Sequence, residues 1–412
     1  MYDSDIGHIT ATFLPFGEMS PTPPPQLSLR AMTGFLVGAS AMFATMYSTQ
    51  GILPDLGRAF DVAPSRAGLT ISVLVIAVVA GAWIWGPLSD RVGRRICLIA
   101  ASALLVPASI AVAVAPSFEA LLAVRAVQGL VLPGLLVVGI PYVSEVFVPA
   151  FGARAMGWYM GSLIAGGLVG RLGVALVTSV TGWRVALGLL AVLPLFATVV
   201  MVRGLPAAPV VAKADLPGRI VNRRVAAAAL AGPSLFFVFV GVFSYIGFRL
   251  EGAPFELSPT AASLVFGVWV VGAVAPFAGR TSERVGWARV ALVGVTAAAV
   301  GVAVAVPDWL PSTVLGLTLI TVGMFTVVTA APIGVGGAEG VRRGAASALY
   351  YSIYYTAGAL GAFLPGLAWQ AGGWNGVSMV VGAALMTGAL GAWLGIAERR
   401  TARVPVAGLS VG

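Results

Sequence analysis

The chain has 412 residues, of which 59% are hydrophobic and only 9% are charged, and its net charge is +9. A soluble globular domain has about a quarter charged residues, so this composition excludes one. The single cysteine, Cys97, excludes an internal disulfide framework. The single histidine, His8, lies in a polar N-terminal stretch, which excludes histidine metal centres and Ser-His-Asp hydrolysis. The composition therefore indicates a helical membrane protein with many spans.

Apolar stretches separated by short basic or Pro/Gly segments follow one another from Arg30 onward. A helix needs about 20 apolar residues to cross a bilayer, and twelve stretches of this chain are long enough. We therefore predict an all-α integral membrane protein with twelve transmembrane helices. The predicted spans are residues 30–52, 66–88, 95–115, 119–141, 153–180, 184–202, 224–248, 260–279, 287–306, 311–332, 343–370 and 375–397.

The two ends and the middle of the chain are more polar than the rest. Residues 1–29 lack the basic start, apolar core and cleavage site of a signal peptide, and we predict a disordered cytoplasmic tail there. Residues 203–223 are predicted to be a cytoplasmic linker between an N-terminal six-helix domain (30–202) and a C-terminal six-helix domain (224–400). Residues 401–412 are predicted to form a second cytoplasmic tail.

The basic residues predict the orientation. If both chain ends lie on one side, 18 of the 24 basic residues fall on that side, four fall on the other, and Arg125 and Arg171 lie within spans. Basic residues collect in cytoplasmic loops, so we expect a bacterial inner-membrane protein with both ends in the cytoplasm. The same rule explains the positive net charge without a nucleic-acid partner.

An internal repeat divides the chain into similar halves. Residues 86–93 match residues 279–286 at an offset of 193, and Trp183 matches Trp374 at an offset of 191. Gly167 and Gly170 match Gly358 and Gly361, also at 191. We predict two pseudo-symmetric six-helix bundles around a central site, an arrangement typical of secondary transporters.

The segment from Gly86 to Arg95 reads G-P-L-S-D-R-V-G-R-R. It resembles the signature loop between helices 2 and 3 of the major facilitator superfamily. The resemblance implies the major facilitator fold and a loop that controls conformational switching, with Asp90 at the N-terminal end of helix 11 near Gly344. The alternative is a topology determinant with a surface ion pair. The predicted latch residues are Gly86, Asp90, Arg91, Gly93, Arg94 and Arg95, with a weaker copy at Glu283 and Arg284.

Two further motifs resemble subfamilies. The Arg-x-x-Gln-Gly pattern that starts at Arg125 resembles helix 4 of the drug:proton antiporter branch. Helix 5 resembles the glycine-rich motif of that branch but ends in Gly-Arg, which is similar to the YnfM-type branch of efflux permeases. The predicted helix 5 motif residues are Gly166, Gly167, Gly170 and Arg171.

Arg125 and Arg171 stand out because an arginine inside a span costs about 2.5–3.5 kcal/mol on insertion scales. Such residues usually face the bundle interior, so we predict that both lie in the central pathway. The alternatives are that they reach toward the lipid headgroups or that they pack against backbone carbonyls. The candidate groups for proton coupling are Arg125, Asp55 near the outer face and Glu145 near the inner face. Asp55 could instead be a plain interfacial residue and Glu145 part of a structural ion pair.

Polar and aromatic residues on the cavity helices predict the substrate site. Tyrosine offers an apolar body, a π face for cations and a hydroxyl, which suits an amphipathic or cationic compound. Interhelical packing is the alternative for each tyrosine. The predicted cavity residues are Tyr47, Gln50, Arg125, Gln128, Arg171, Tyr245, Tyr351, Tyr354 and Tyr355, with Tyr350 beside them.

We predict a secondary active transporter that exports small amphipathic or drug-like compounds by alternating access, with the coupling to the proton gradient that the resemblance implies. A sugar or metabolite exporter, an uncoupled facilitator and, more remotely, a receptor that does not transport are the alternatives. The sequence has neither a nucleotide-binding Gly-Lys motif nor a nucleophile–base pair, so we expect no enzyme, no cofactor and no metal. The expected partners are the substrate, protons and lipid, with the chain as a monomer.

Overall fold

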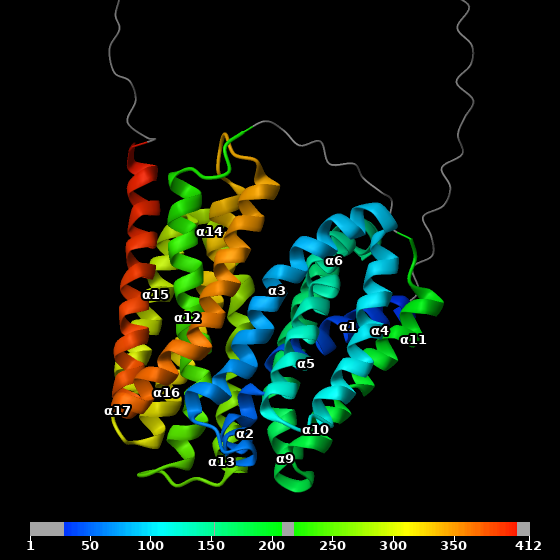
Figure 1. Cartoon of the computed structure of the whole chain (residues 1–412). Helices are drawn as coiled ribbons and strands as arrows, with labels where there is room; N and C mark the ends of the chain where they lie inside the picture. The colour runs from blue at the N-terminus through cyan, green and yellow to red at the C-terminus, as the bar shows by residue number, and fades with distance from the viewer. Residues whose placement is uncertain (1–28, 152, 208–217, 402–412) are drawn as a thin grey trace, which may run out of the picture.

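The computed structural model describes residues 29–151, 153–207 and 218–401. Residues 208–217 of the predicted linker and the predicted tails, apart from Leu29 and Thr401, lie outside these residues. The described chain is helical apart from one isolated β-bridge between Arg219 and Val341. Figure 1 shows the helices in two groups that lie side by side, one formed by each half of the chain.

The first group contains six spans, and four of them are interrupted. The spans are α1 (Leu29–Tyr47) with η1 (Gln50–Ile52) and α2 (Leu53–Phe60); α3 (Pro64–Val92); α4 (Arg94–Ala113); α5 (Phe118–Val131) with α6 (Pro133–Tyr142), η2 (Val143–Phe147) and α7 (Val148–Phe151); α8 (Ala153–Leu168) with η3 (Val169–Gly173) and α9 (Val174–Thr181); and α10 (Trp183–Leu189) with α11 (Val192–Gly204).

The second group has longer uninterrupted helices. They are α12 (Arg223–Glu251); α13 (Pro259–Ser263) with η4 (Leu264–Val274) and α14 (Ala275–Val285); α15 (Trp287–Val304); α16 (Leu310–Gly336); and α17 (Arg343–Thr401). The last helix forms two spans because its backbone leaves the helical region at Gly372 and Gly373. Gly376 then packs against Ala368 across this turn.

The spans agree with the twelve predicted from the sequence. In the described chain ten helical segments are long and apolar enough to cross a membrane, a pair of helices bent by 46° adds another, and the turn inside α17 divides that segment in two. Some boundaries differ from the prediction. The first span continues to Phe60 and the fourth to Phe151, because short amphipathic or π-helical segments extend them beyond the apolar run.

Glycine ends equivalent helices in the two halves. Gly93 and Gly286, 193 residues apart, have φ of 92° and 98°. Gly182 and Gly373, 191 residues apart, have φ of 84° and 55°. Residues with a side chain rarely adopt positive φ, so these positions require glycine for a sharp change of direction. The backbone thus repeats where the sequence repeats.

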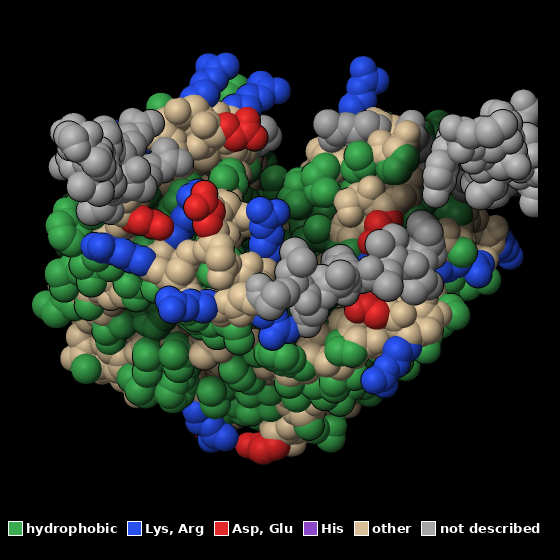
Figure 2. All heavy atoms as spheres, turned by 90° about the horizontal axis from the view of Figure 1, so that it is seen from above, with side chains coloured by type: hydrophobic (Ala, Val, Ile, Leu, Met, Phe, Trp, Pro, Cys, Tyr) green, Lys and Arg blue, Asp and Glu red, His purple; other side chains and the backbone are tan. Residues whose placement is uncertain are grey.

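The two halves separate toward one face of the molecule. We call this the arginine-rich face; it is at the top of Figure 1, and Figure 2 looks onto it. Figure 2 shows basic side chains across this face and a hollow between the halves. The described arginines of this face are Arg30, Arg91, Arg94, Arg95, Arg154, Arg203, Arg219, Arg223, Arg224, Arg280, Arg284, Arg289, Arg342 and Arg343. The halves converge at the other end, the opposite face, which carries Arg58, Arg66, Arg184 and Arg249.

Candidate transport pathway and gate

Arg125 binds the end of α1, where the first span is broken. The helix α1 stops at Tyr47, so carbonyls in its last turn have no partner within the helix. The guanidinium of Arg125, on α5, donates from Nη1 to the Thr45 carbonyl at 2.8 Å and from Nη2 to the Met46 carbonyl at 3.0 Å. A cation at the C-terminal end of a helix is also favoured by the helix dipole. Arg125 is fully buried and acts as the cap of this helix.

The remaining donors of Arg125 are also occupied. Its Nε donates to the Thr70 carbonyl of α3 at 3.0 Å, and Nη1 donates to Gln128 Oε1 at 2.9 Å and to Ser48 Oγ at 3.2 Å. Asp55 is not its partner, because Asp55 accepts from Arg58 at 2.8 Å. The structure therefore matches the alternative in which Arg125 packs against backbone carbonyls, and Asp55, the candidate acid near the outer face, pairs with Arg58 instead.

Arg171 lies in a different setting, between aromatic rings. Its guanidinium carbon is 3.6 Å from the ring centroid of Tyr47 and 4.0 Å from that of Trp269, and Phe239 lies at 5.7 Å. Nε donates to Gln50 Oε1 at 2.6 Å, and Nη1 donates to the Gly167 carbonyl at 3.1 Å. Arg171 is fully buried, yet Nη2 has no hydrogen-bond partner among the described residues. We call Tyr47, Gln50, Arg171, Phe239 and Trp269 the Arg171 gate.

The glycines of the helix 5 motif make this arrangement possible. Gly166 and Gly170 pack directly on the backbone of α1, against Ser40 and Ala44. A Cβ on Gly167 would lie 2.9 Å from the indole of Trp269, so only glycine leaves room for that ring beside Arg171. The motif therefore brings α8 and η3 onto α1 and admits a side chain from the other half.

The Arg171 gate joins the two halves. Gln50 Nε2, besides its oxygen contact with Arg171, donates to Ser244 Oγ at 3.2 Å. Trp269 Nε1 donates to the Ile164 carbonyl at 2.9 Å. Further contacts between the halves are Ser72 Oγ to the Ala359 carbonyl at 2.7 Å, Gln370 Nε2 to Ser65 Oγ at 2.7 Å, and the ion pair of Arg58 with Glu251 at 2.6 Å. These contacts lie from the middle of the membrane to the opposite face, so the pathway is closed there.

The predicted cavity tyrosines divide into two groups. Tyr354 stacks on Phe236 with ring centroids 4.1 Å apart, and Tyr355 meets the same ring edge-on at 5.9 Å. Tyr351, beside them, is 38% exposed. Tyr245 is instead fully buried and donates to the Ala362 carbonyl at 2.6 Å. It therefore ties α12 to α17, and the interpretation as interhelical packing holds for this residue.

The predicted latch loop is not engaged with the second half in this structure. The carboxylate of Asp90 is 69% exposed and lies 3.8 Å from Arg94 Nη1. Among the described residues the ion pair of Asp90 is with Arg94, so the latch position beside Gly344, predicted for one of the two states, is not occupied in this one. Arg94 instead pairs with Glu145 through Nε at 2.5 Å and Nη2 at 2.8 Å, which is the structural ion pair considered for Glu145.

The other latch positions lie on the arginine-rich face. Arg95 donates to the carbonyls of Leu205 and Val202 at 2.5 and 3.0 Å and holds the end of α11. Gly86, Arg91 and Gly93 surround the turn between α3 and α4. Glu283 and Arg284 are exposed at the equivalent turn of the second half.

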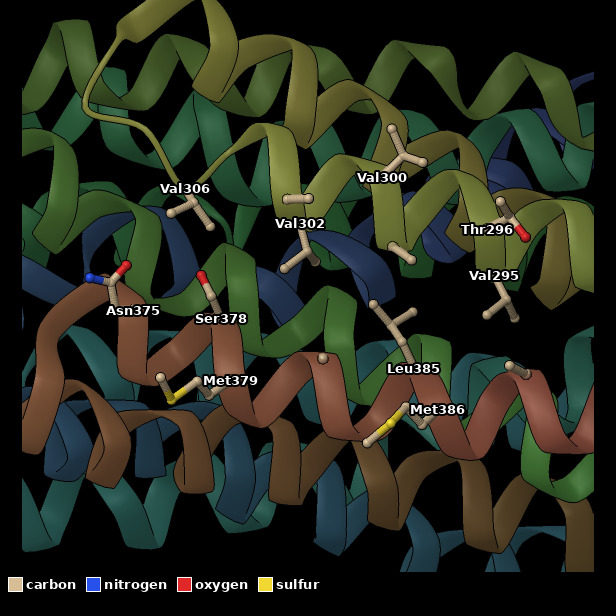
Figure 3. Close-up of a pocket in the computed structure, with 14 residues that line it drawn as sticks. Val295, Thr296, Val300, Val302, Val306, Asn375, Ser378, Met379, Leu385 and Met386 are labelled. Atoms are coloured by element: carbon tan, nitrogen blue, oxygen red, sulfur yellow. The ribbon is translucent and has the colours of Figure 1, made fainter.

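A lateral groove of about 620 Å³ lies between α15 and the second part of α17 (Figure 3). Its walls are mainly aliphatic, with Asn375 and Ser378 at one end. Met379 and Met386 on its rim are 76% and 71% exposed. The groove therefore opens on the outer surface of the second half, away from the Arg171 gate.

Several gate residues were not predicted from the sequence. Phe239 on α12 and Trp269 on η4 are far from Arg171 in the chain, and nothing local marks them as its partners. The pair of Arg58 and Glu251 is equally non-local. One signal was present in the sequence: Gly167, about one helical turn before the buried Arg171, leaves room for another group to approach closely.

Comparison with known proteins agrees with this geometry. The family model described as Major Facilitator Superfamily matches residues 35–334. The chain belongs to the major facilitator superfamily. It is a carrier with the twelve-helix major facilitator fold, embedded in a membrane as a multi-pass protein, and not an enzyme.

Individual relatives extend the comparison. The inner membrane transport protein YnfM of Escherichia coli (strain K12) is 29% identical over 363 residues, which cover 86% of this chain and 87% of that protein. A chloramphenicol resistance protein of Pseudomonas aeruginosa is 27% identical over 318 residues, which cover 73% and 75%. The structure of a bacterial homologue of the human lysosomal transporter Spinster, inward-facing and occupied, has a TM-score of 0.72 at 14% identity, and the match covers 90% of this chain and 96% of that one.

Proposed function

We propose that this major facilitator protein exports small amphipathic or drug-like compounds from the cytoplasm by alternating access, with energy from the proton gradient. The observation that carries the proposal is the set of contacts between the halves, which closes the pathway toward the opposite face and leaves a hollow at the arginine-rich face. The positive-inside rule places the arginine-rich face in the cytoplasm. In that orientation the structure is open to the cytoplasm, ready to take up a compound for export.

The aromatic side chains between the helices of the pathway support the substrate class. Phe236, Tyr354 and Tyr355 form one aromatic cluster, and the Arg171 gate adds three more rings. Gln50 and Gln128, the amides that would favour a sugar, are both already bound to buried arginines. The chloramphenicol resistance relative is consistent with a drug-like substrate. We expect the working unit to be a monomer.

The latch remains part of this proposal. Opening of the opposite face requires the halves to come together at the arginine-rich face. We infer that Asp90 then leaves solvent and reaches the N-terminal end of α17, where the helix dipole favours a carboxylate. The loop would thus stabilise the outward-open state.

The positions of the acidic residues bear on whether transport is coupled to protons. The described acids lie at or near one face or the other, and none lies at the level of the Arg171 gate inside the described membrane region. They are Asp55, Asp61, Asp90, Glu119, Glu145, Glu251, Glu256, Glu283, Asp308, Glu339 and Glu398. In the proposed cycle the proton would therefore bind an acid near one of the faces, and an uncoupled facilitator, which needs no such acid, is the alternative.

Dye efflux from a host that lacks its own pumps tests the function. Cells with the wild-type chain should lose ethidium or fluorescein faster than cells with the Asp90→Asn variant expressed at equal level. A protonophore, which removes both the pH gradient and the membrane potential, should stop efflux if protons drive it. Efflux that persists under the protonophore would establish the facilitator, and equal dye retention in all strains across a broad substrate panel would contradict export.

A further inference from the structure

The membrane interior of this protein carries positive charge without a described carboxylate to balance it. Arg125 and Arg171 are both fully buried. The ion pairs in the described chain involve other arginines near the two faces. A buried charge is normally paired or fully hydrogen-bonded, because removal from water is costly. The imbalance indicates that an anion enters the pathway during part of the cycle.

Only one of the two arginines has donors to spare. Arg125 uses Nε, Nη1 and Nη2 on carbonyls and polar side chains of its own half. Arg171 has hydrogen bonds from Nε and Nη1 alone, and its buried Nη2 has no partner among the described residues. A guanidinium presents its N–H groups as a fork that fits a carboxylate, sulfonate or phosphate. Of the two buried arginines, Arg171 is therefore the one with N–H groups available to bind such an anion.

The surroundings of Arg171 change when the gate opens. Tyr47, Gln50 and the Gly167 carbonyl belong to the same half as Arg171 and can remain with it. Trp269 and Phe239 belong to the other half, so separation of the halves removes their π faces from the cation. The gate therefore holds Arg171 on aromatic rings while closed and leaves it in need of an anion when open.

We propose that Arg171 binds the anionic group of the transported compound, so that the substrates are organic anions with an aromatic or other apolar body. This assignment rests on the proposed export function and specifies its substrate class. The anion takes the place of Trp269 beside the guanidinium, while Tyr47 remains stacked on it. Substrate binding and gate opening then favour each other, because the anionic group of the substrate replaces the aromatic contacts that Arg171 loses when the gate opens.

An anionic substrate also accounts for the position of the acids. The interior of a bacterial cell is electrically negative, so the membrane potential itself drives an anion outward. Such a carrier needs no carboxylate in the middle of the membrane to couple export to an energy source. For an anionic substrate, the membrane potential would therefore add to the driving force that the proposed proton coupling supplies.

Equilibrium binding tests the assignment without relying on transport. The full chain in lipid nanodiscs is titrated with two permanently charged fluorescent probes of the same apolar body, 2-naphthalenesulfonate and 2-naphthyltrimethylammonium, and fluorescence anisotropy is measured. We expect the sulfonate to bind at least about tenfold more tightly than the ammonium, in line with the strength of charge-assisted hydrogen bonds. Arg171→Gln should abolish this preference, and Arg171→Lys should restore part of it.

A matched control separates the site from general surface charge. Arg66→Gln removes one arginine that is paired with Glu119 at the opposite face, where both side chains are exposed, and should leave the sulfonate preference unchanged. Equal binding of both probes, stronger binding of the ammonium, or an unchanged preference in Arg171→Gln would overturn the assignment. The two proposals can be contradicted independently. Export without anion preference contradicts only the substrate class, whereas anion binding without export contradicts the proposed function.

Discussion

Arg125 and Arg171 are two fully buried arginines in the same half of the molecule, yet their surroundings differ. Arg125 lies among polar groups of its own half and caps the broken first span. Arg171 lies between aromatic rings from both halves and keeps donors free. A buried charge within one rigid half thus stabilises the fold, whereas one held between the two halves is placed to take part in the transport cycle.

Replacement of Arg125 should give the largest effect on stability. Arg125→Ala leaves the Met46 carbonyl buried without its donor and the Thr45 carbonyl with contacts from Ser48 alone, and a buried unsatisfied group costs about 1–3 kcal/mol. We expect a clear fall in the thermal unfolding midpoint of detergent-solubilised protein, followed by size-exclusion chromatography after heating. Arg66→Ala, at the exposed surface, is the control. An unchanged midpoint in Arg125→Ala would refute the capping role.

Removal of the indole from the Arg171 gate should shift conformation more than stability. A desolvated cation–π contact contributes about 2 kcal/mol, so Trp269→Leu should favour separation of the halves at the opposite face. A cysteine introduced by Ser244→Cys reports this opening through its rate of thiol labelling, because the native Cys97 is buried. We expect faster labelling in Trp269→Leu than in the parent. Equal rates would show that the ring does not hold the gate closed.

A side chain at Gly167 offers a second route to the same opening. The added Cβ in Gly167→Ala would lie 2.9 Å from the indole of Trp269, so the ring must move away from Arg171. We expect labelling at position 244 to rise, though less than in Trp269→Leu because the indole is still present. Gly161→Ala is the matched control, since nothing lies within 4 Å of its Cβ site. A similar labelling rate in both variants would show that gate opening does not depend on the position of the Trp269 ring.

The ion pair between the halves should have the smallest effect. Arg58 is 56% exposed, and exposed pairs contribute about 0–1 kcal/mol. Glu251→Gln should therefore raise the labelling rate at position 244 only slightly, and the difference should shrink further in high salt. A double-mutant cycle with Arg58→Gln measures the coupling directly. A large, salt-independent effect would show that this pair, and not the Arg171 gate, is the main interaction that keeps the opposite face closed.

The internal repeat predicted equivalent positions but not equivalent interactions. Gly93 and Gly286 turn the chain alike, but the next residue is Arg94 in one half and Trp287 in the other. Arg94 holds α4 to η2 through Glu145, whereas Trp287 is buried against Gly334 and Gly395. The backbone repeat follows from glycine, which is visible in the sequence, while each half stabilises its turn with different chemistry.

The tryptophans after the fifth and eleventh spans give a second example. An arginine lies over each ring: Arg184 over Trp183 at 4.3 Å and Arg249 over Trp374 at 4.6 Å. Both arginines donate to carbonyls at the end of a neighbouring helix, Arg184 to Ala115 at 2.8 Å and Arg249 to Val306 at 2.9 Å. Arg184 follows its tryptophan directly, but Arg249 comes from a different helix. Spacing alone therefore identified the ring and not its partner.

The sequence by itself determined the membrane class, the number of spans, the family and the two arginines that needed an explanation. Those properties depend on local composition, on the length of apolar runs and on the cost of charge in lipid, and each can be read along the chain. Tertiary structure alone decided which arginine became a helix cap and which became a gate. That choice depends on donors and rings from distant segments, such as Thr45 for Arg125 and Trp269 for Arg171, whose proximity no local pattern specifies.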